Sequence, residues 1–224
     1  MKTLVFAPHP DDETLSCGGY LLKEHKKGNL TKVVLITGGR TGPNLVNAVN
    51  LADERNNEFI SACKRLSAEY EIYGFENNFF EGDKTKVIER IIKTIKNFKP
   101  EIVLIPQKED IHRIHGDVYY AVKEAVYHCE TGAYNSHSNG GIPRINLFCY
   151  ESPKSELQIK GVNVCDISDF FDEKIKIFSE CYKSQNVREF QVWPKLRTEY
   201  WGEKIKVKYG EAFMPDEIAR LLIE

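Results

Sequence analysis

The sequence has no long apolar run and no large excess of charge of either sign. None of its apolar stretches approaches the roughly 18 residues that a membrane span requires, so we expect no membrane-spanning segment. The apolar N-terminal piece also meets acidic residues too early for a signal peptide. With 31 basic and 33 acidic residues, the net charge is −2, and the chain has no broad positive field for nucleic acid or anionic lipid. These absences favour a cytoplasmic protein that binds a small or neutral partner.

Paired cysteines, internal repeats and low-complexity tracts are also absent from the sequence. A chain of 224 residues is long enough to bury a full core without disulfides, and we expect one domain spanning residues 1–224. No CxxC pair occurs, so reduced and mostly buried thiols are the expectation. The cysteines are Cys17, Cys63, Cys129, Cys149, Cys165 and Cys181.

Segments with strand character alternate with segments of helical periodicity. The runs VVLIT and IVLIP are continuously apolar, which is typical of parallel strands buried on both faces. Residues 52–68 and 86–98 each place apolar side chains on one helical face. This alternation predicts an α/β fold, Rossmann-like and doubly wound, with a mainly parallel sheet flanked by helices. The expected strands are residues 4–8, 32–37, 71–75, 101–106 and 146–151.

Two segments rich in chemically active side chains follow the first and fourth of these strands. In the common order 3-2-1-4-5 these strands are neighbours, and ligands bind where their connections part at the carboxyl ends. The first strand runs into PHPDDE and the fourth into PQKEDIHRIHGD, so the order places both at one crevice. Residues 129–143 are rich in glycine, serine and asparagine, and we expect a long exposed loop near the same face.

His9, Asp12 and a histidine from HRIH would give two imidazoles and one carboxylate around a metal ion. Such a set leaves positions for water and substrate, which is typical of catalytic rather than structural zinc sites. A divalent cation would also offset the repulsion among the three consecutive acids that begin at Asp11. The alternative is that these acids only line the start of a helix, where the helix dipole favours negative charge.

The stretch APHPDDETLSCGG resembles the opening signature of the LmbE-like or PIG-L-type family of zinc-dependent de-N-acetylases. These enzymes act largely on compounds that contain N-acetylglucosamine. Further resemblances lie along the chain in LITGGRTG, RNNE, HRIH, YKSQ and YGEAF. The resemblance therefore covers nearly the whole sequence, and its opening motif is the most specific part.

Carried over by position, the resemblance implies that His9, Asp12 and His115 bind the metal. It also implies that Asp11 is the catalytic base, which takes a proton from the attacking water. His112 would then stabilise the developing oxyanion.

One position departs from the family pattern. Ile114 stands where the family usually has an aspartate that helps to orient the histidine pair and keep it charged. Asp110 and Asp117 are the candidates to replace that acid.

Two arginines are candidate substrate-binding residues. Arg40 follows the second expected strand and Arg55 lies on the next helix, so either could reach a hydroxyl or phosphate group. For Arg55 the alternative is a simple ion pair with Glu58 at helical i,i+3 spacing.

Together these features predict a metal-dependent hydrolase that removes the acetyl group from an N-acetylated amino sugar. Zinc is the first choice of metal, and ferrous iron also suits this ligand set. One alternative is an amidase on another N-acyl substrate, such as a thiol conjugate or an antibiotic precursor. Another is a non-catalytic metal- or nucleotide-binding module, although the glycine phosphate fingerprint is missing. A homo-oligomer remains open.

Overall fold

The computed structural model describes residues 1–38, 48–133, 141–152, 161–184 and 187–216. In these residues seven strands form one sheet with the order β3-β2-β1-β4-β5-β7-β6. The strands are β1 (Lys2–Ala7), β2 (Leu30–Thr37), β3 (Glu69–Phe75), β4 (Ile102–Pro106), β5 (Asn146–Tyr150), β6 (Asn163–Asp166) and β7 (Gly210–Pro215). The helices are α1 (Asp12–Lys26), α2 (Ala48–Arg65), α3 (Phe79–Gly82), α4 (Lys84–Phe98), α5 (Arg113–Thr131), α6 (Phe171–Cys181) and α7 (Val187–Lys204).

The predicted fold class and strand order are confirmed. Strands β3, β2, β1, β4 and β5 are parallel to one another, and β1 lies between β2 and β4. The sheet continues beyond the prediction, because β7 pairs antiparallel with both β5 and β6. Strand β6 has only four residues, and β7 includes the charged residue Glu211, so neither shows the continuous apolar run of a buried parallel strand.

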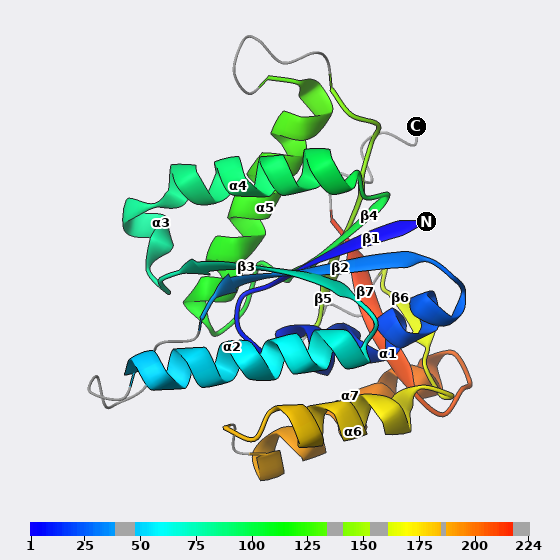
Figure 1. The fold of residues 1–224 in the computed structure, drawn as a ribbon. Helices are drawn as coiled ribbons and strands as arrows, with labels where there is room; N and C mark the ends of the chain where they lie inside the picture. The colour runs from blue at the N-terminus through cyan, green and yellow to red at the C-terminus, as the bar shows by residue number, and fades with distance from the viewer. Residues whose placement is uncertain (39–47, 134–140, 153–160, 185–186, 217–224) are drawn as a thin grey trace.

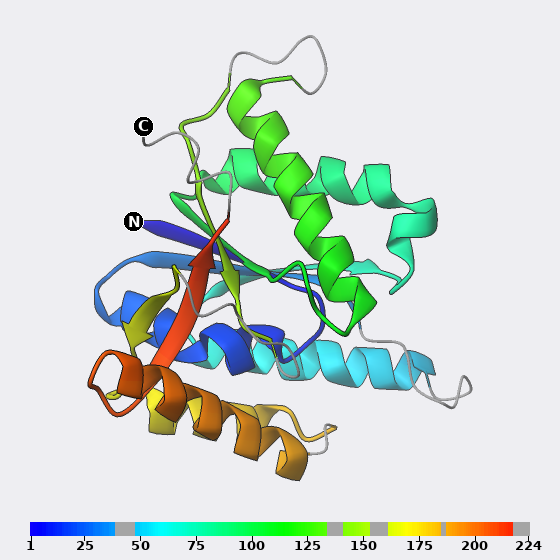
Figure 2. The same cartoon turned by 180° about the vertical axis from the view of Figure 1, so that it is seen from behind.

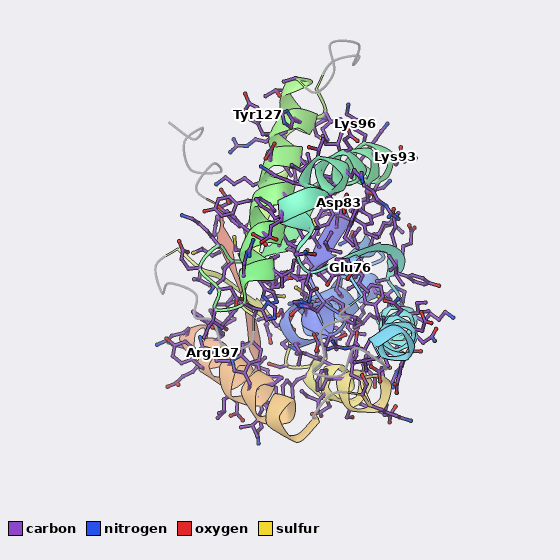
Figure 3. The ribbon with its side chains drawn as sticks, turned by 90° about the vertical axis from the view of Figure 1, so that its left-hand side faces the viewer. Glu76, Asp83, Lys93, Lys96, Tyr127 and Arg197 are labelled. Carbon is purple, nitrogen blue, oxygen red and sulfur yellow. The ribbon has the colours of Figure 1, made fainter. Side chains whose placement is uncertain are left out.

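The helices cover both faces of the sheet (Figure 1), and the view from behind shows α7 packed beside β7 (Figure 2). Helices α4 and α5 lie on one face, while α1, α2, α6 and α7 lie on the other. The side view separates the same layers, with Lys93 and Lys96 of α4 on one side and Arg197 of α7 on the other (Figure 3). Alternation along β1 produces two cores, because Leu4 and Phe6 face α4 and α5 whereas Val5 and Ala7 face α1 and α2.

The expectation for residues 129–143 is wrong in two respects. Cys129 is a fully buried residue in the last turn of α5, so the helix continues further than its composition suggests. The described parts of the segment, residues 129–133 and 141–143, also lie away from the crevice, because α5 starts beside the carboxyl end of β4 and runs back to the opposite edge. There Asn146 pairs with Ile102 at the beginning of β4. Residues 134–140 lie outside the described residues.

The expected state of the cysteines agrees with the structure, in which all six are free and four are buried. Burial raises the pKa of the Cys17 and Cys63 thiols well above the usual value, so both are inert as nucleophiles. Within the described residues, no helix has the length and apolar character needed to cross a membrane.

Candidate metal and catalytic site

The turn after β1 is held by the neighbouring strand. Thr37, at the end of β2, donates from its backbone N–H and its hydroxyl to the Pro8 carbonyl, at 3.1 and 2.7 Å. This fixes the chain just before His9. The Asp12 carboxylate then accepts the backbone N–H of His9 at 2.9 Å, which turns Asp12 back toward the histidine.

The second half of the site comes from the start of α5. His112 immediately precedes this helix and His115 lies in its first turn, next to the carboxyl end of β4. The ring centroids of His9 and His115 are 5.4 Å apart, and those of His9 and His112 are 4.7 Å apart. The two distant pieces of sequence therefore meet at the crevice that the strand order predicts.

His9, Asp12 and His115 could hold a metal ion between them. The Nδ1 atom of His9 lies 3.5 Å from Asp12 Oδ2 and 3.3 Å from His115 Nε2, and the third side of this triangle, from His115 Nε2 to Asp12 Oδ2, is 3.4 Å. In a tetrahedral zinc site with bonds of about 2.0 to 2.1 Å, ligand atoms are about 3.3 to 3.4 Å apart. The three donor atoms thus have the spacing and chemistry of three of the four ligands in a tetrahedral zinc site. The fourth position would be left for water or substrate.

Asp110 orients the His115 ring. Its Oδ2 atom lies 2.8 Å from His115 Nδ1, so the ring proton sits on Nδ1 and the Nε2 lone pair is free for a metal. Its Oδ1 atom accepts the backbone N–H of His112 at 2.8 Å, and the Ser152 hydroxyl also donates to this carboxylate. Asp110 is therefore the acid that supports the histidine pair in this chain.

The charges of the cluster reinforce one another. Burial alone would raise the pKa of the Asp12 carboxyl, but His115 and His9 outweigh it and lower that pKa to about 2. For His115, burial favours the neutral ring, yet Asp12 and Asp110 together raise its pKa above the usual value. The acidic residues around His115 thus favour a positive charge at the centre of the cluster.

Asp11 has an uncommon backbone conformation. Its φ of 118° and ψ of −30° lie outside the regions that non-glycine residues usually occupy, which costs of order 1–3 kcal/mol. Its carbonyl accepts the N–H groups of Thr14 and Leu15 at 3.0 and 2.9 Å, while its side chain makes no capping bond to the described residues of α1. If Asp11 only lined the start of the helix, the hydrogen bonds of its carbonyl would be explained, but the position of its carboxylate would not.

The environment of Asp11 shifts its pKa in the direction opposite to that of Asp12. Burial raises the pKa of the Asp11 carboxyl well above its usual value, and the charges of Asp12 and Glu13 add to the effect. The Arg55 guanidinium works in the other direction. A carboxylate with a raised pKa is suited to accept and return a proton near neutral pH.

Glu13 is a support for the strained turn. It is fully buried, and its Oε2 atom accepts the Asp11 N–H at 3.2 Å. Its Oε1 atom accepts hydrogen bonds from the hydroxyl groups of Thr14 and Tyr182, the second of which follows α6. Burial nevertheless raises the pKa of Glu13 above its usual value.

His112 stands at the solvent-exposed rim of the site, and its ring stacks on His115 with centroids 5.3 Å apart. Partial burial and the nearby His9 and His115 lower the pKa of the His112 ring below its usual value. Ile114 points away from the site into the core beside α4 and is 2 % exposed. Asp117 instead lies near Arg113 and does not take the place of the missing acid.

Of the two candidate substrate-binding arginines, Arg40 lies outside the described residues. Arg55 is half-buried on α2, close enough to Asp11 to lower its pKa. Glu58 is buried and accepts the backbone N–H and hydroxyl of Ser184, at 2.7 and 2.6 Å. Glu58 of the RNNE motif and Ser184 of the YKSQ motif are therefore hydrogen-bonded beside the site. The simple exposed ion pair between Arg55 and Glu58 does not account for this buried carboxylate.

Ser152 and Tyr182 also belong to the site, although neither was among the residues predicted for it. Ser152 comes just after β5, at the same carboxyl edge of the sheet as His9 and His112, so its place after a strand was the available signal. Tyr182 lies within YKSQ, but its contact with Glu13 spans 169 residues of sequence and has no local signature.

The chain belongs to the GlcNAc-PI de-N-acetylase (PIG-L) family, whose model matches residues 4–126. That region contains all of the candidate ligands, as well as Asp11 and His112. Family membership supports a deacetylase enzyme, and His9, Asp12 and His115 could hold a metal ion.

Solved structures of known proteins share the fold over nearly the whole chain. A conserved protein from Thermus thermophilus is 25 % identical, with a TM-score of 0.77 and coverage of 95 % of this chain and 93 % of that one. The N,N′-diacetylchitobiose deacetylase from Pyrococcus horikoshii is 20 % identical, with a TM-score of 0.82 and coverage of 99 % and 86 %. The 4-carboxy-2-hydroxymuconate hydratase from Pseudomonas putida is 19 % identical, with a TM-score of 0.81 and coverage of 96 % of each chain.

Proposed function

We propose that this protein is a zinc-dependent N-deacetylase that converts an N-acetylated amino sugar, of the N-acetylglucosamine type, into acetate and a free amine. The observation that carries the proposal is that a candidate metal ligand and a candidate base are adjacent residues in one turn. Asp12 completes a three-atom ligand set with His9 and His115, while the adjacent Asp11 is buried beside it with a raised pKa. A metal site with a separate carboxylate base is one arrangement that catalyses amide hydrolysis.

His9, Asp12 and His115 would hold the ion, with Asp110 fixing His115. A bound zinc ion supplies a water molecule of lowered pKa and polarises the acetamide carbonyl. Iron(II) suits the same ligands.

Asp11 accepts the proton of the attacking water and returns it to the departing amine. The His112 ring, at the exposed rim, donates a hydrogen bond to the developing oxyanion. Arg55, next to Asp11, is placed to bind a hydroxyl or phosphate group of the substrate. The substrate is a small molecule taken up from solvent at this open side.

The direct test is to incubate the zinc-loaded protein with N,N′-diacetylchitobiose, N-acetylglucosamine and a nucleotide-linked N-acetylglucosamine, and to follow acetate and free amine by NMR. We expect stoichiometric release of both products from at least one substrate, and loss of release after zinc is removed by a chelator. The absence of acetate from all three would contradict the amino-sugar assignment, and a panel of other N-acyl compounds would then identify another amidase.

Three single variants separate the proposed roles. Asp11→Asn should keep zinc and lose roughly 100- to 10,000-fold in turnover, because the base is removed. His112→Ala should also keep zinc while the chemical step slows, whereas His115→Ala should lose zinc. Near-normal turnover by Asp11→Asn, or zinc loss from His112→Ala rather than from His115→Ala, would overturn the assignment.

The hydratase of the same fold provides a second candidate, the addition of water to a carbon–carbon double bond. It would use the same base and water but release no amine. Incubation with 4-carboxy-2-hydroxymuconate, followed by ultraviolet absorbance, distinguishes the two. We expect no change in the dienol absorbance, and rapid loss of it would favour the hydratase.

A further inference from the structure

A buried ion pair lies behind the site, away from every residue assigned above. Lys174 of α6 and Glu211 of β7 are 0 % and 3 % exposed, and their Nζ and Oε1 atoms are 2.7 Å apart. Two charges removed from water are tolerated only when further hydrogen bonds satisfy them. The partners that supply those bonds show what the pair does.

All of these further bonds go to the backbone of α1. The Glu211 carboxylate accepts the N–H of Gly19 at 2.9 Å and of Tyr20 at 2.7 Å. The Lys174 ammonium donates to the Leu15 carbonyl at 2.7 Å. In a regular helix the carbonyl of Leu15 accepts a hydrogen bond from the N–H of Gly19. Here Lys174 binds that carbonyl and Glu211 binds that N–H, so the ion pair contacts both groups of one helical hydrogen bond.

The two glycines of α1 make this close approach possible. A Cβ atom at Gly18 would lie 3.2 Å from the Lys174 Cγ, and one at Gly19 would lie 2.7 Å from the Ile167 Cδ1. Side chains at these positions would push α6 and the segment before it away from α1, which packs directly against α6 (Figure 1). Gly18 therefore leaves room for the Lys174 side chain, and Gly19 leaves room for Ile167.

Leu15 connects the ion pair to the reacting carboxylates. Its carbonyl is held by Lys174, and its N–H donates to the Asp11 carbonyl at 2.9 Å. Asp11 is the residue with the strained backbone, and Asp12 follows it in the first turn. The ion pair is thus connected through the single residue Leu15 to the turn that sets the directions of both carboxylate side chains.

We infer that Lys174 and Glu211 are positioning residues, which lock the first turn of α1 so that Asp11 and Asp12 keep their places relative to His9 and His115. The inference rests on the proposed metal site but not on the identity of the substrate. It also assigns a role to the glutamate of the YGEAF motif, far along the chain from the ligands.

The test replaces the pair by neutral residues of similar size, as Lys174→Met with Glu211→Gln. Replacing both partners avoids leaving one buried charge alone. Cobalt(II) is the probe, because its visible spectrum reports ligand geometry without any substrate. We expect a changed spectrum and roughly 10- to 100-fold weaker cobalt binding, as is found when outer partners of metal ligands are removed.

The matched control is a second lysine–acid pair, which joins α5, on the opposite face of the sheet from α1, to the residue that follows β7. Lys123 Nζ lies 2.9 Å from Asp216 Oδ1, and the control variant is Lys123→Met with Asp216→Asn. We expect it to bind cobalt as the unmodified protein does. A normal cobalt spectrum and affinity in the Lys174/Glu211 variant, or equal losses in both variants, would overturn the inference.

Gly18→Ala gives an answer even where the double variant does not fold. It keeps both charges and improves helix propensity, while its methyl group displaces the Lys174 stem. We expect a protein at least as resistant to urea, with a shifted cobalt spectrum and weaker cobalt binding. An unchanged spectrum and affinity would contradict the positioning role. Failure of the proposed function shows separately, as absence of acetate release by the unmodified protein that still binds cobalt.

Discussion

Two adjacent aspartates acquire different chemistry from their local surroundings. Asp12 faces two imidazoles and is held ionised, with a pKa of about 2. Asp11 faces mainly carboxylates and apolar atoms, and its pKa rises well above the usual value. Asp11 is also the residue of this turn with a positive φ, of 118°. In the proposed mechanism, this strained residue is the base and the next residue is a metal ligand.

Asp110 is predicted to support metal binding through His115. Replacing it in Asp110→Asn removes the charge that holds the Nδ1 proton, and zinc affinity should fall about 10- to 100-fold. Competition with a chromophoric chelator measures this. Asp117→Asn is the control, since Asp117 lies near Arg113 instead, and it should bind zinc normally. The reverse result would assign the supporting role to Asp117.

The pH dependence of metal binding should follow His115. Its pKa is raised above the usual value near 6.5, so a proton begins to compete with the metal at a correspondingly higher pH. As pH falls through this pKa, the apparent affinity for cobalt should decrease by about tenfold per pH unit. Asp12 stays ionised throughout, because its pKa is about 2.

Asp110→Asn should move the onset of this pH effect to lower pH, since it removes one of the charges that raise the pKa of His115. Isothermal titration at a series of pH values measures the onset. An onset unchanged in Asp110→Asn would show that Asp110 does not act on His115.

Among the elements, α1 has two structural roles. Its first turn positions the carboxylates, and its middle packs closely against α6 and the segment before it. Gly19→Ala should lower the free energy of unfolding by about 1–3 kcal/mol, since the new methyl group overlaps Ile167. Urea denaturation measures the change. Gly82→Ala, in α3, is the control: its Cβ would meet no atom within 4 Å, and stability should be nearly unchanged. Equal stabilities of the two variants would exclude the tight packing of α1.

At the scale of the whole molecule, the ligands come from two segments about 100 residues apart, which only the folded sheet brings together. An ion that binds the folded chain alone should therefore stabilise it, by about 2.7 kcal/mol at a free concentration 100 times the dissociation constant. Thermal unfolding with and without zinc measures this effect. His115→Ala should show no comparable stabilisation, and equal stabilisation of both proteins would place the zinc elsewhere.

Local sequence determined much of the architecture. Continuous apolar runs and helical periodicity predicted the five parallel strands and helices α2 and α4, because burial leaves a direct mark on composition. The doubly wound order then placed PHPDDE and HRIH at one edge. Strand β6 was missed because it has only four residues, and β7 because Glu211 interrupts its apolar run. Residues 129–131 were assigned to a loop although they complete α5.

What the sequence by itself determined was the set of reactive groups and the crevice they would share, since both follow from residue type and strand order. Tertiary structure decided how those groups are held. It selected Asp110 over Asp117 as the partner of His115, placed Tyr182 on Glu13, and inserted Lys174 and Glu211 beside α1. These contacts join residues on separate elements, most of them far apart in sequence. Their geometry depends on how whole elements pack, which no local pattern encodes.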